Sequence, residues 1–371
     1  MTPAWQDPSH TALIAGDTSA GAATAGVFRV LLDFVESQGR RVGLDWASRT
    51  LAPDAVWLRC DPDGAYFCAR IDLLLRSNGI ATVVLAEDLP AGFRANATSC
   101  LRALGYEVVE LPLETALATW RAAASCLRGW QPAVKAASLL PDLRSRLDPA
   151  RTAVIFIDVQ NDFCHRQGAV GRNGEPITRI EQTVPRLRSL LAAARQAGTL
   201  VVHVKAEYGQ VFRSIGSPYR FPAHDRREPA VWTASAAEPD ETNGFAPEEV
   251  EVCLAGSWGG AFVDGMEPAP GEALLVKHRY SAFRDTGLQV LLRANGISTL
   301  VFGGVTTNCC VESAVREAAM RDFYTIVAED CVAVKDRLLD LHEASLEHMG
   351  LYFALRRPLA ALREAWGLPA A

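Results

Sequence analysis

The sequence has no long apolar run and no basic leader. Its apolar stretches have the length of strands, well short of the roughly 20 residues that a membrane-spanning helix needs. The first ten residues, MTPAWQDPSH, contain neither the basic start nor the apolar centre of a secretion signal. We therefore expect a cytoplasmic protein that does not cross a membrane.

An excess of positive charge is also absent. The 37 Lys and Arg are outnumbered by 43 Asp and Glu, which gives a formal net charge of −6, and both signs are mixed along the chain. Proteins that bind nucleic acids or anionic membrane surfaces usually present a basic patch. The charge balance therefore argues against either kind of partner.

Cysteine spacing typical of structural zinc sites is missing too. The nine cysteines include no CxxC pair, so their spacing does not support such a site. An odd number of cysteines in a long chain without a secretion signal also argues against a disulfide framework. Most of these thiols are expected to be small buried apolar side chains. The question is which one is reactive.

Alternating strand-like and helix-like stretches predict two α/β domains. The first, residues 1–130, is small and includes an expected helix at Ala22–Gln38. Residues 131–150 contain three prolines and weak periodicity, as expected of a linker. Residues 151–371 form the larger domain. Its continuous apolar runs, such as residues 152–158, are typical of central parallel strands.

Three reactive side chains lie at or just beyond the ends of predicted strands in the second domain. Open parallel sheets bind ligands outside the carboxyl ends of their strands. Asp158 would be partly desolvated there, which suits a general base or acid. Lys277 could hold a thiolate and a carboxylate together. Cys310, at the start of a predicted helix, is expected to have a lowered pKa and nearby backbone N–H groups for an oxyanion.

Each of these residues also has an ordinary structural explanation when it is considered alone. Asp158 can be a helix cap or a turn residue, and Lys277 can be a solvated residue at a strand end. Cys309 and Cys310 can be a buried structural pair, and two adjacent cysteines cannot both be the nucleophile. The prediction therefore depends on the combination.

The order and spacing of these motifs resemble the isochorismatase-like cysteine hydrolase superfamily over residues 149–368. The motifs are IDVQNDF around Asp158, KHRYSAF beginning at Lys277, and TTNCCVES around Cys310. The resemblance implies a three-layer α/β/α domain with a parallel sheet, and an amidohydrolase in which Cys310 attacks while Asp158 and Lys277 assist. The register with the following VES selects Cys310 over Cys309.

The resemblance also implies further parts of the site. The backbone N–H groups of Thr306 and Cys310 would form an oxyanion hole, and a non-proline cis peptide bond would join Val305 to Thr306. Arg279 could pair with a substrate carboxylate or be structural, and an isolated tryptophan such as Trp258 is often a packing residue. The full set of expected substrate-binding residues is Asn161, Phe163, Trp258, Arg279, Tyr280, Phe283 and Asn308.

The branch of the superfamily is suggested by what these motifs contain and what they lack. Nicotinamidases carry a D-x-H metal pattern after the strand that corresponds to residues 199–205, where this chain continues AEYGQVFRSIG. We therefore expect no metal and no other cofactor. The KHRYSAF and VTTN strings look most like ureidoacrylate and biuret hydrolases. They imply a small linear amide, ureido or carbamoyl substrate, and the resemblance to the family implies a homo-oligomer.

Two alternatives stay open. The hydrolase fold could serve binding or assembly without turnover, or the chain could be bifunctional, with a second site near Cys126. The segment Ala95–Leu127 has a faint resemblance to the end of pentein hydrolases, but it lacks the glycine run that precedes their cysteine. The segment Asp17–Gly21 could bind an anion at a helix start, yet it matches neither a P-loop nor a dinucleotide-binding fingerprint.

Overall fold

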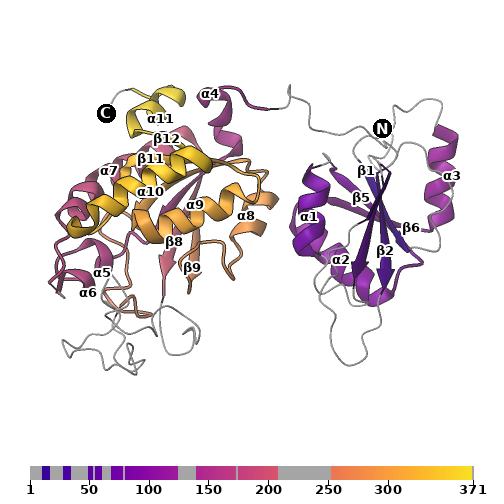
Figure 1. Cartoon of the computed structure of the whole chain (residues 1–371), viewed down its shortest axis with the longest axis horizontal. Coiled ribbons are helices and arrows are strands. Elements are labelled where there is room, and N and C mark those ends of the chain that lie inside the picture. The colour runs from indigo at the N-terminus through magenta and orange to yellow at the C-terminus, as the bar shows by residue number, and fades with distance from the viewer. Residues whose placement is uncertain are drawn as a thin grey trace. The chain divides into compact units, whose positions relative to one another are not determined.

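The structure, a computed structural model, falls into two compact units, Met1–Leu140 and Pro141–Ala371 (Figure 1). The residues it describes are 11–16, 28–34, 49–52, 55–60, 68–77, 80–123, 139–172, 174–207 and 252–369. Cys126, residues 131–138 of the predicted linker and residues 208–251 of the long irregular segment lie outside these ranges. In the described ranges no helix is long and apolar enough to cross a membrane.

The first unit is built on a six-stranded sheet in the order β3-β4-β2-β1-β5-β6, in which only β3 runs antiparallel to its neighbour. The predicted small α/β domain is therefore confirmed. The strands are β1 (Thr11–Gly16), β2 (Phe28–Phe34), β3 (Arg49–Ala52), β4 (Ala55–Cys60), β5 (Thr82–Ala86) and β6 (Glu107–Leu111). The helices are α1 (Cys68–Ser77), α2 (Ala91–Ala103) and α3 (Leu113–Ala123).

The helix expected at Ala22–Gln38 is wrong, because the structure has β2 in this segment. Its sequence, FRVLLDF, is a short apolar run, and such a run is compatible with a buried strand or a buried helix. Pairing with β1 on one side and β4 on the other makes it a central strand. The core of this unit includes β1, β5 and the helix residues Phe93 and Leu101.

One cysteine forms a disulfide, although the sequence argues against a disulfide framework. Cys100, near the end of α2, is disulfide-bonded. Cys164, Cys253, Cys310 and Cys331 are buried free thiols, and Cys309 is a partly exposed free thiol. Counts and spacings along a chain do not reveal a single pairing that depends on how distant segments approach.

The second unit contains a fully parallel six-stranded sheet in the order β12-β11-β10-β7-β8-β9, as predicted. Its strands are β7 (Thr152–Ile157), β8 (Leu200–Ala206), β9 (Ala273–Lys277), β10 (Thr299–Val305), β11 (Tyr324–Ala333) and β12 (Leu355–Arg357). Its helices are α4 (Leu143–Arg146), α5 (Asn161–Cys164), α6 (Ala169–Arg172), α7 (Thr178–Ala197), α8 (Leu288–Ala294), α9 (Glu312–Ala319), α10 (Leu339–Tyr352) and α11 (Leu359–Ala365).

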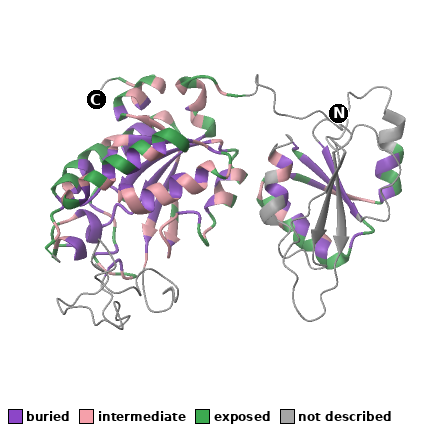
Figure 2. Cartoon of the chain, viewed as in Figure 1, coloured by how far each residue is buried: buried purple, intermediate pink, exposed green. Residues whose placement is uncertain are grey.

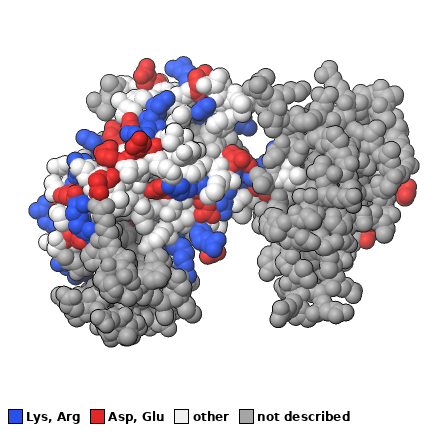
Figure 3. Space-filling view, viewed as in Figure 1, with Lys and Arg blue, Asp and Glu red and all other residues white. Residues whose placement is uncertain are grey.

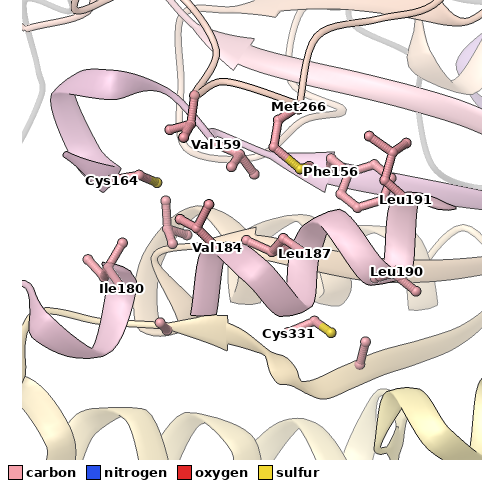
Figure 4. Packing of buried hydrophobic residues seen from close by; sticks show 14 of the residues in the cluster. Phe156, Val159, Cys164, Ile180, Val184, Leu187, Leu190, Leu191, Met266 and Cys331 are labelled. Atoms are coloured by element: carbon pink, nitrogen blue, oxygen red, sulfur yellow. The ribbon is translucent and has the colours of Figure 1, made fainter. Parts of the chain in front are cut away.

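The sheet separates two apolar cores, and alternate side chains of its central strands enter one or the other. Figure 2 shows that buried residues predominate in the central strands of this sheet, whereas exposed residues lie mainly on the helices and loops. Val154 and Phe156 of β7 pack with α7 and α11, whereas Ile155 and Ile157 pack with α8, α9 and α10. Figure 4 shows Phe156 beside Leu191 of α7. This arrangement produces the predicted three layers. On the face visible in Figure 3, acidic and basic side chains of this unit are interspersed.

Two glycines at the end of β10 let this strand approach its neighbours closely. A Cβ on Gly303 would lie 3.1 Å from side-chain carbons of both Leu187 and Leu190. Gly304 has a φ of +126°, and a Cβ there would lie 2.1 Å from the carbonyl oxygen of Ile157. Only glycine fits position 304, because both the conformation and the space exclude a side chain. The close contact brings the end of β10 against the end of β7.

We expect Gly304→Ala to reduce the free energy of unfolding by at least about 2 kcal/mol, because alanine would be strained and would overlap the backbone of β7. Urea unfolding of the full chain measures the change. Gly287→Ala is the matched control, because Gly287 has a φ of −80° and its Cβ would meet nothing within 4 Å. Equal stability of the two variants would contradict the close approach.

Candidate active site

The structure brings Asp158, Lys277 and Cys310 together at the carboxyl edge of the second sheet. Asp158 directly follows β7, Lys277 is the last residue of β9, and Cys310 lies in the turn after β10. Lys277 Nζ is 2.7 Å from Asp158 Oδ2 and 3.4 Å from Cys310 Sγ. The three residues have exposed fractions of 1%, 0% and 6% in chain order. The ammonium group therefore bridges a carboxylate and a thiol away from bulk water.

The backbone of Asp158 turns sharply as it leaves the sheet. Its φ is +52°, in the left-handed region that aspartate adopts more readily than most other non-glycine residues. The N–H of Asp158 still donates to the Val204 carbonyl at 2.9 Å, and its own carbonyl accepts the Gln160 N–H at 2.8 Å. The residue thus completes pairing with β8 and at the same time ends the strand.

Burial dominates the electrostatics of the carboxylate. It raises the pKa of Asp158, while the charge of Lys277 acts in the opposite direction. Burial by itself would lower the pKa of Lys277, but the neighbouring Asp158 and Cys310 raise it above its usual range. The lysine is therefore a permanent cation, and Asp158 is a stronger base than an exposed aspartate.

The thiol of Cys310 differs from the expectation that a helix start lowers its pKa. A hydrogen bond with the Cys309 thiol and burial both raise the pKa of Cys310, and the carboxylate of Asp158 adds to this. Lys277 opposes the shift without reversing it. In the resting site the nucleophile candidate is accordingly a thiol next to a base.

Cys310 lies in a single turn of π-helix, Thr307–Val311, which leads directly into α9. The carbonyl oxygen of Thr306 accepts N–H groups from both Cys309 and Val311, at 3.1 and 3.2 Å. The cis peptide bond expected between Val305 and Thr306 is present. Single π turns inside helices are uncommon and often occur at functional sites.

The side chains that follow Asp158 hold the segment 252–263, a role that the motif alone did not reveal. Gln160 is fully buried, and its amide nitrogen donates to the carbonyls of Ala206 and Gly260 at 2.9 and 3.0 Å. Its amide oxygen accepts the Ala206 N–H at 2.7 Å. One side chain therefore joins the end of β8 to this segment.

Asp162 completes the same attachment. Its carboxylate accepts the Ala169 N–H at 2.9 Å and the Cys253 N–H at 2.6 Å. A Cβ on Gly259 would lie 2.2 Å from this carboxylate, so the segment packs directly against it. The signal in the sequence that could have indicated this role is a run of polar residues directly after an apolar strand, together with the pair Gly259-Gly260.

The polar residues and the tryptophan expected to bind substrate differ in exposure and in the contacts that they make. The side-chain amide of Asn161 donates to the Trp258 carbonyl at 2.9 Å, so it supports the same segment. Trp258 is 52% exposed, and its ring forms a T-shaped pair with that of His165. Asn308 is partly exposed within the π turn. Arg279 is half-buried, and its guanidinium donates to the His278 carbonyl at 2.7 Å.

The aromatic candidates are mainly core residues. Phe163 is buried in the cluster on the α7 side of the sheet, opposite to the cluster that contains Cys310. Phe283 is buried on the Cys310 side, where its ring lies 6.1 Å from that of Phe323, and Tyr280 packs against the same cluster. Family position therefore placed these three residues near the site without separating packing from substrate contact.

One histidine, His203 of β8, is buried and joins a network with Glu272 and Arg195. His203 Nε2 lies 2.9 Å from the carboxylate of Glu272, which also receives two hydrogen bonds from Arg195. Within the described ranges, no three His, Cys, Asp or Glu side chains are placed to share a metal ion. His203 thus has a structural environment, in keeping with its position inside a strand.

Comparison with known proteins identifies this arrangement at the family level. Residues 152–356 match the model of the isochorismatase domain. The ureidoacrylate amidohydrolase RutB of Methylobacterium radiotolerans is 34% identical over 223 residues, which cover 60% of this chain and 82% of that protein. The RutB of Agrobacterium fabrum is 34% identical over 185 residues, covering 50% of this chain and 76% of that protein.

Two solved structures align with the same region. A cysteine hydrolase from Pseudomonas syringae has 22% identity and a TM-score of 0.47, and the match covers 62% of this chain and 98% of the other. The N-carbamoylsarcosine amidase of Thermoplasma acidophilum has 25% identity and a TM-score of 0.41, with coverages of 56% and 96%.

We expect Lys277→Met to lower the free energy of unfolding at pH 7 by about 3–5 kcal/mol, because it leaves a buried carboxylate without its cation. The pKa of Asp158 in the folded state would then lie far above the value of roughly 3.9 in the unfolded chain. The folded state therefore binds a proton more tightly, and the deficit should shrink as the pH falls.

Urea unfolding at a series of pH values measures this effect. Lys205→Met is the matched control. Lys205 lies in β8, the strand beside β9, and forms a partly exposed ion pair with Glu207 at 3.6 Å. Such pairs contribute less than about 1 kcal/mol. The double variant Asp158→Asn with Lys277→Met should lose the pH dependence. A pH-independent deficit in Lys277→Met alone would contradict the buried ion pair.

Proposed function

Because this chain belongs to the isochorismatase family of hydrolases, we propose that it is a cysteine amidohydrolase that cleaves the C–N bond of a small linear ureido, carbamoyl or amide compound. The buried contact of Lys277 with both Asp158 and Cys310 carries the proposal. Lys277 Nζ lies 2.7 Å from the proposed base and 3.4 Å from the proposed nucleophile, which supports nucleophilic catalysis by Cys310 with Asp158 as its base. Relatives that act on ureidoacrylate support the substrate class.

The first step transfers the proton of the Cys310 thiol to Asp158 as the sulfur attacks the substrate carbonyl carbon. Because the thiol is protonated at rest, attack and proton transfer are coupled. Lys277 stabilises the negative charge as it moves from the carboxylate to the sulfur. The tetrahedral oxyanion would be held by the backbone N–H groups of Thr306 and Cys310.

The second step breaks the C–N bond. Asp158 returns its proton to the leaving nitrogen, ammonia or an amine departs, and the carbonyl carbon remains bonded to Cys310 as a thioester. Water then attacks this carbon, with Asp158 accepting a proton and passing it to the departing sulfur. The cycle restores the thiol and the carboxylate, and every proton moves through groups that this chain supplies.

We expect Cys310→Ala to reduce ammonia release by at least roughly a thousandfold, because no other group can form the thioester. The assay is ammonia or amine release from a panel of ureido, carbamoyl and simple amide compounds. Cys309→Ala should retain turnover within about tenfold, because it leaves the attacking sulfur in place. If the unaltered enzyme released ammonia or amine from no compound in the panel, the fold would serve binding or assembly instead.

The acid limb of the pH–rate profile should report Asp158. The base must be unprotonated to accept the thiol proton, and burial raises its pKa. We therefore expect kcat/KM to fall as the pH drops, with a midpoint above the usual carboxyl value of about 4. Activity recovered after return to pH 7 controls for acid unfolding. Full activity maintained below that value would exclude Asp158 as the base.

A further inference from the structure

One face of α10 contacts the nucleophile turn through polar groups. His342 Nδ1 lies 2.9 Å from the hydroxyl oxygen of Thr307, the first residue of the π turn. One turn further along the helix, Ser345 donates its hydroxyl proton to Glu312 at 2.6 Å. Residues three apart lie on the same helix face, so both contacts come from one side of α10. The helix therefore touches both the π turn and the start of α9.

The His342–Thr307 contact is shielded from water. Thr307 is fully buried and His342 is 9% exposed. Burial lowers the pKa of His342, which keeps the ring neutral near pH 7. A neutral imidazole can donate to or accept from a hydroxyl at Nδ1, depending on its tautomer. A buried polar group that loses its partner costs about 1–3 kcal/mol, so this pair favours one position of the turn over others.

The turn needs tertiary support because its own backbone pattern is irregular. Cys309 and Val311 share one acceptor, the carbonyl of Thr306, which is followed directly by Thr307. Cys310 is three residues beyond Thr307, and its sulfur must stay near Lys277 Nζ, 3.4 Å away. Misplacement of a catalytic group by about 1 Å can reduce a rate by roughly a hundredfold.

We propose that His342 is a positioning residue, which acts through Thr307 to hold the π turn so that the Cys310 sulfur stays within reach of Lys277. The inference deepens the proposed cysteine hydrolase function and rests on it. Neither His342 nor Thr307 is assigned a contact with substrate, since the Thr307 hydroxyl is buried against the ring.

The kinetic test uses variants that remove one partner at nearly constant shape. Thr307→Val and His342→Leu should each lower kcat by about 10- to 100-fold while KM changes by less than about threefold. His342→Asn, whose amide can occupy the place of Nδ1, should recover most of the lost kcat. The kcat of the double variant Thr307→Val with His342→Leu should be no lower than that of the less active single variant, because both substitutions remove the same contact.

Thr299→Val is the matched control. Thr299 is a fully buried threonine at the amino end of β10, and its hydroxyl has no hydrogen-bond partner among the residues that the structure describes. The same substitution there should leave kcat unchanged. It tests whether loss of a buried hydroxyl by itself affects turnover.

A second measurement does not depend on the substrate. The pH profile of Cys310 alkylation by iodoacetamide, read from fragment masses that separate Cys310 from Cys309, reports the charge environment of the thiol set by Lys277, Asp158 and Cys309. If the sulfur moves away from Lys277 in Thr307→Val and His342→Leu, the pH midpoint of Cys310 alkylation should rise by about 0.5 to 1 pH unit. A change in how easily iodoacetamide reaches Cys310 would instead alter the alkylation rate at high pH.

The outcomes separate this inference from the proposed function. A folded Thr307→Val with normal kcat and an unshifted midpoint would overturn the positioning role, even if the enzyme hydrolyses ureido compounds. Normal values in His342→Leu, with losses in Thr307→Val, would overturn the role of His342. If no substrate is turned over, the alkylation midpoints still decide the question. If His342→Leu does not fold, Thr307→Val and His342→Asn decide it.

Discussion

A fully buried lysine is the constraint on which the candidate site depends. A buried cation is unfavourable unless an anion lies beside it and its N–H groups have hydrogen-bond acceptors. Lys277 meets this condition only because Asp158 is 2.7 Å away and the Cys310 sulfur is 3.4 Å away. These three residues come from three different strand ends. The order β10-β7-β8-β9 places those ends along one edge of the sheet, and the missing side chain of Gly304 lets β10 and β7 meet closely there.

The motif that begins at Asp158 serves two purposes at once. Its first residue pairs with Lys277, whereas Gln160 and Asp162 direct their side chains to backbone groups around them. Backbone N–H and C=O groups in an irregular segment lack the hydrogen bonds of a helix or sheet, and buried polar side chains can supply partners for them. A polar residue near a candidate catalytic position can therefore have a structural contact, as the hydrogen bond from Asn161 to the Trp258 carbonyl illustrates.

The charges in the site bear on how Cys310, the proposed nucleophile, would be controlled. Burial and the neighbouring Cys309 thiol raise the pKa of Cys310, so its position near a helix start does not make it a preformed thiolate. Burial also makes Asp158 more basic. In the proposed mechanism these shifts complement each other, because the thiol keeps its proton until a substrate arrives and the base is then strong enough to accept it. In this mechanism the positive charge of Lys277 balances one negative charge, on Asp158 or on Cys310, at every step.

The sequence by itself determined the fold class and the strand ends at which the reactive residues lie. Apolar runs such as TAVIFI, each followed by a polar residue, are local signals, and they predicted a parallel sheet with Asp158 and Lys277 at its carboxyl edge. The same kind of signal failed at β2, where a short apolar run fits a helix or a strand until its neighbours are known. Only the tertiary structure decided that Lys277 lies between Asp158 and Cys310, that Gln160 and Asp162 hold the segment 252–263, and that His342 meets Thr307. Those facts depend on strand order, burial and contacts between residues far apart in the chain, and none of these is encoded in a local pattern.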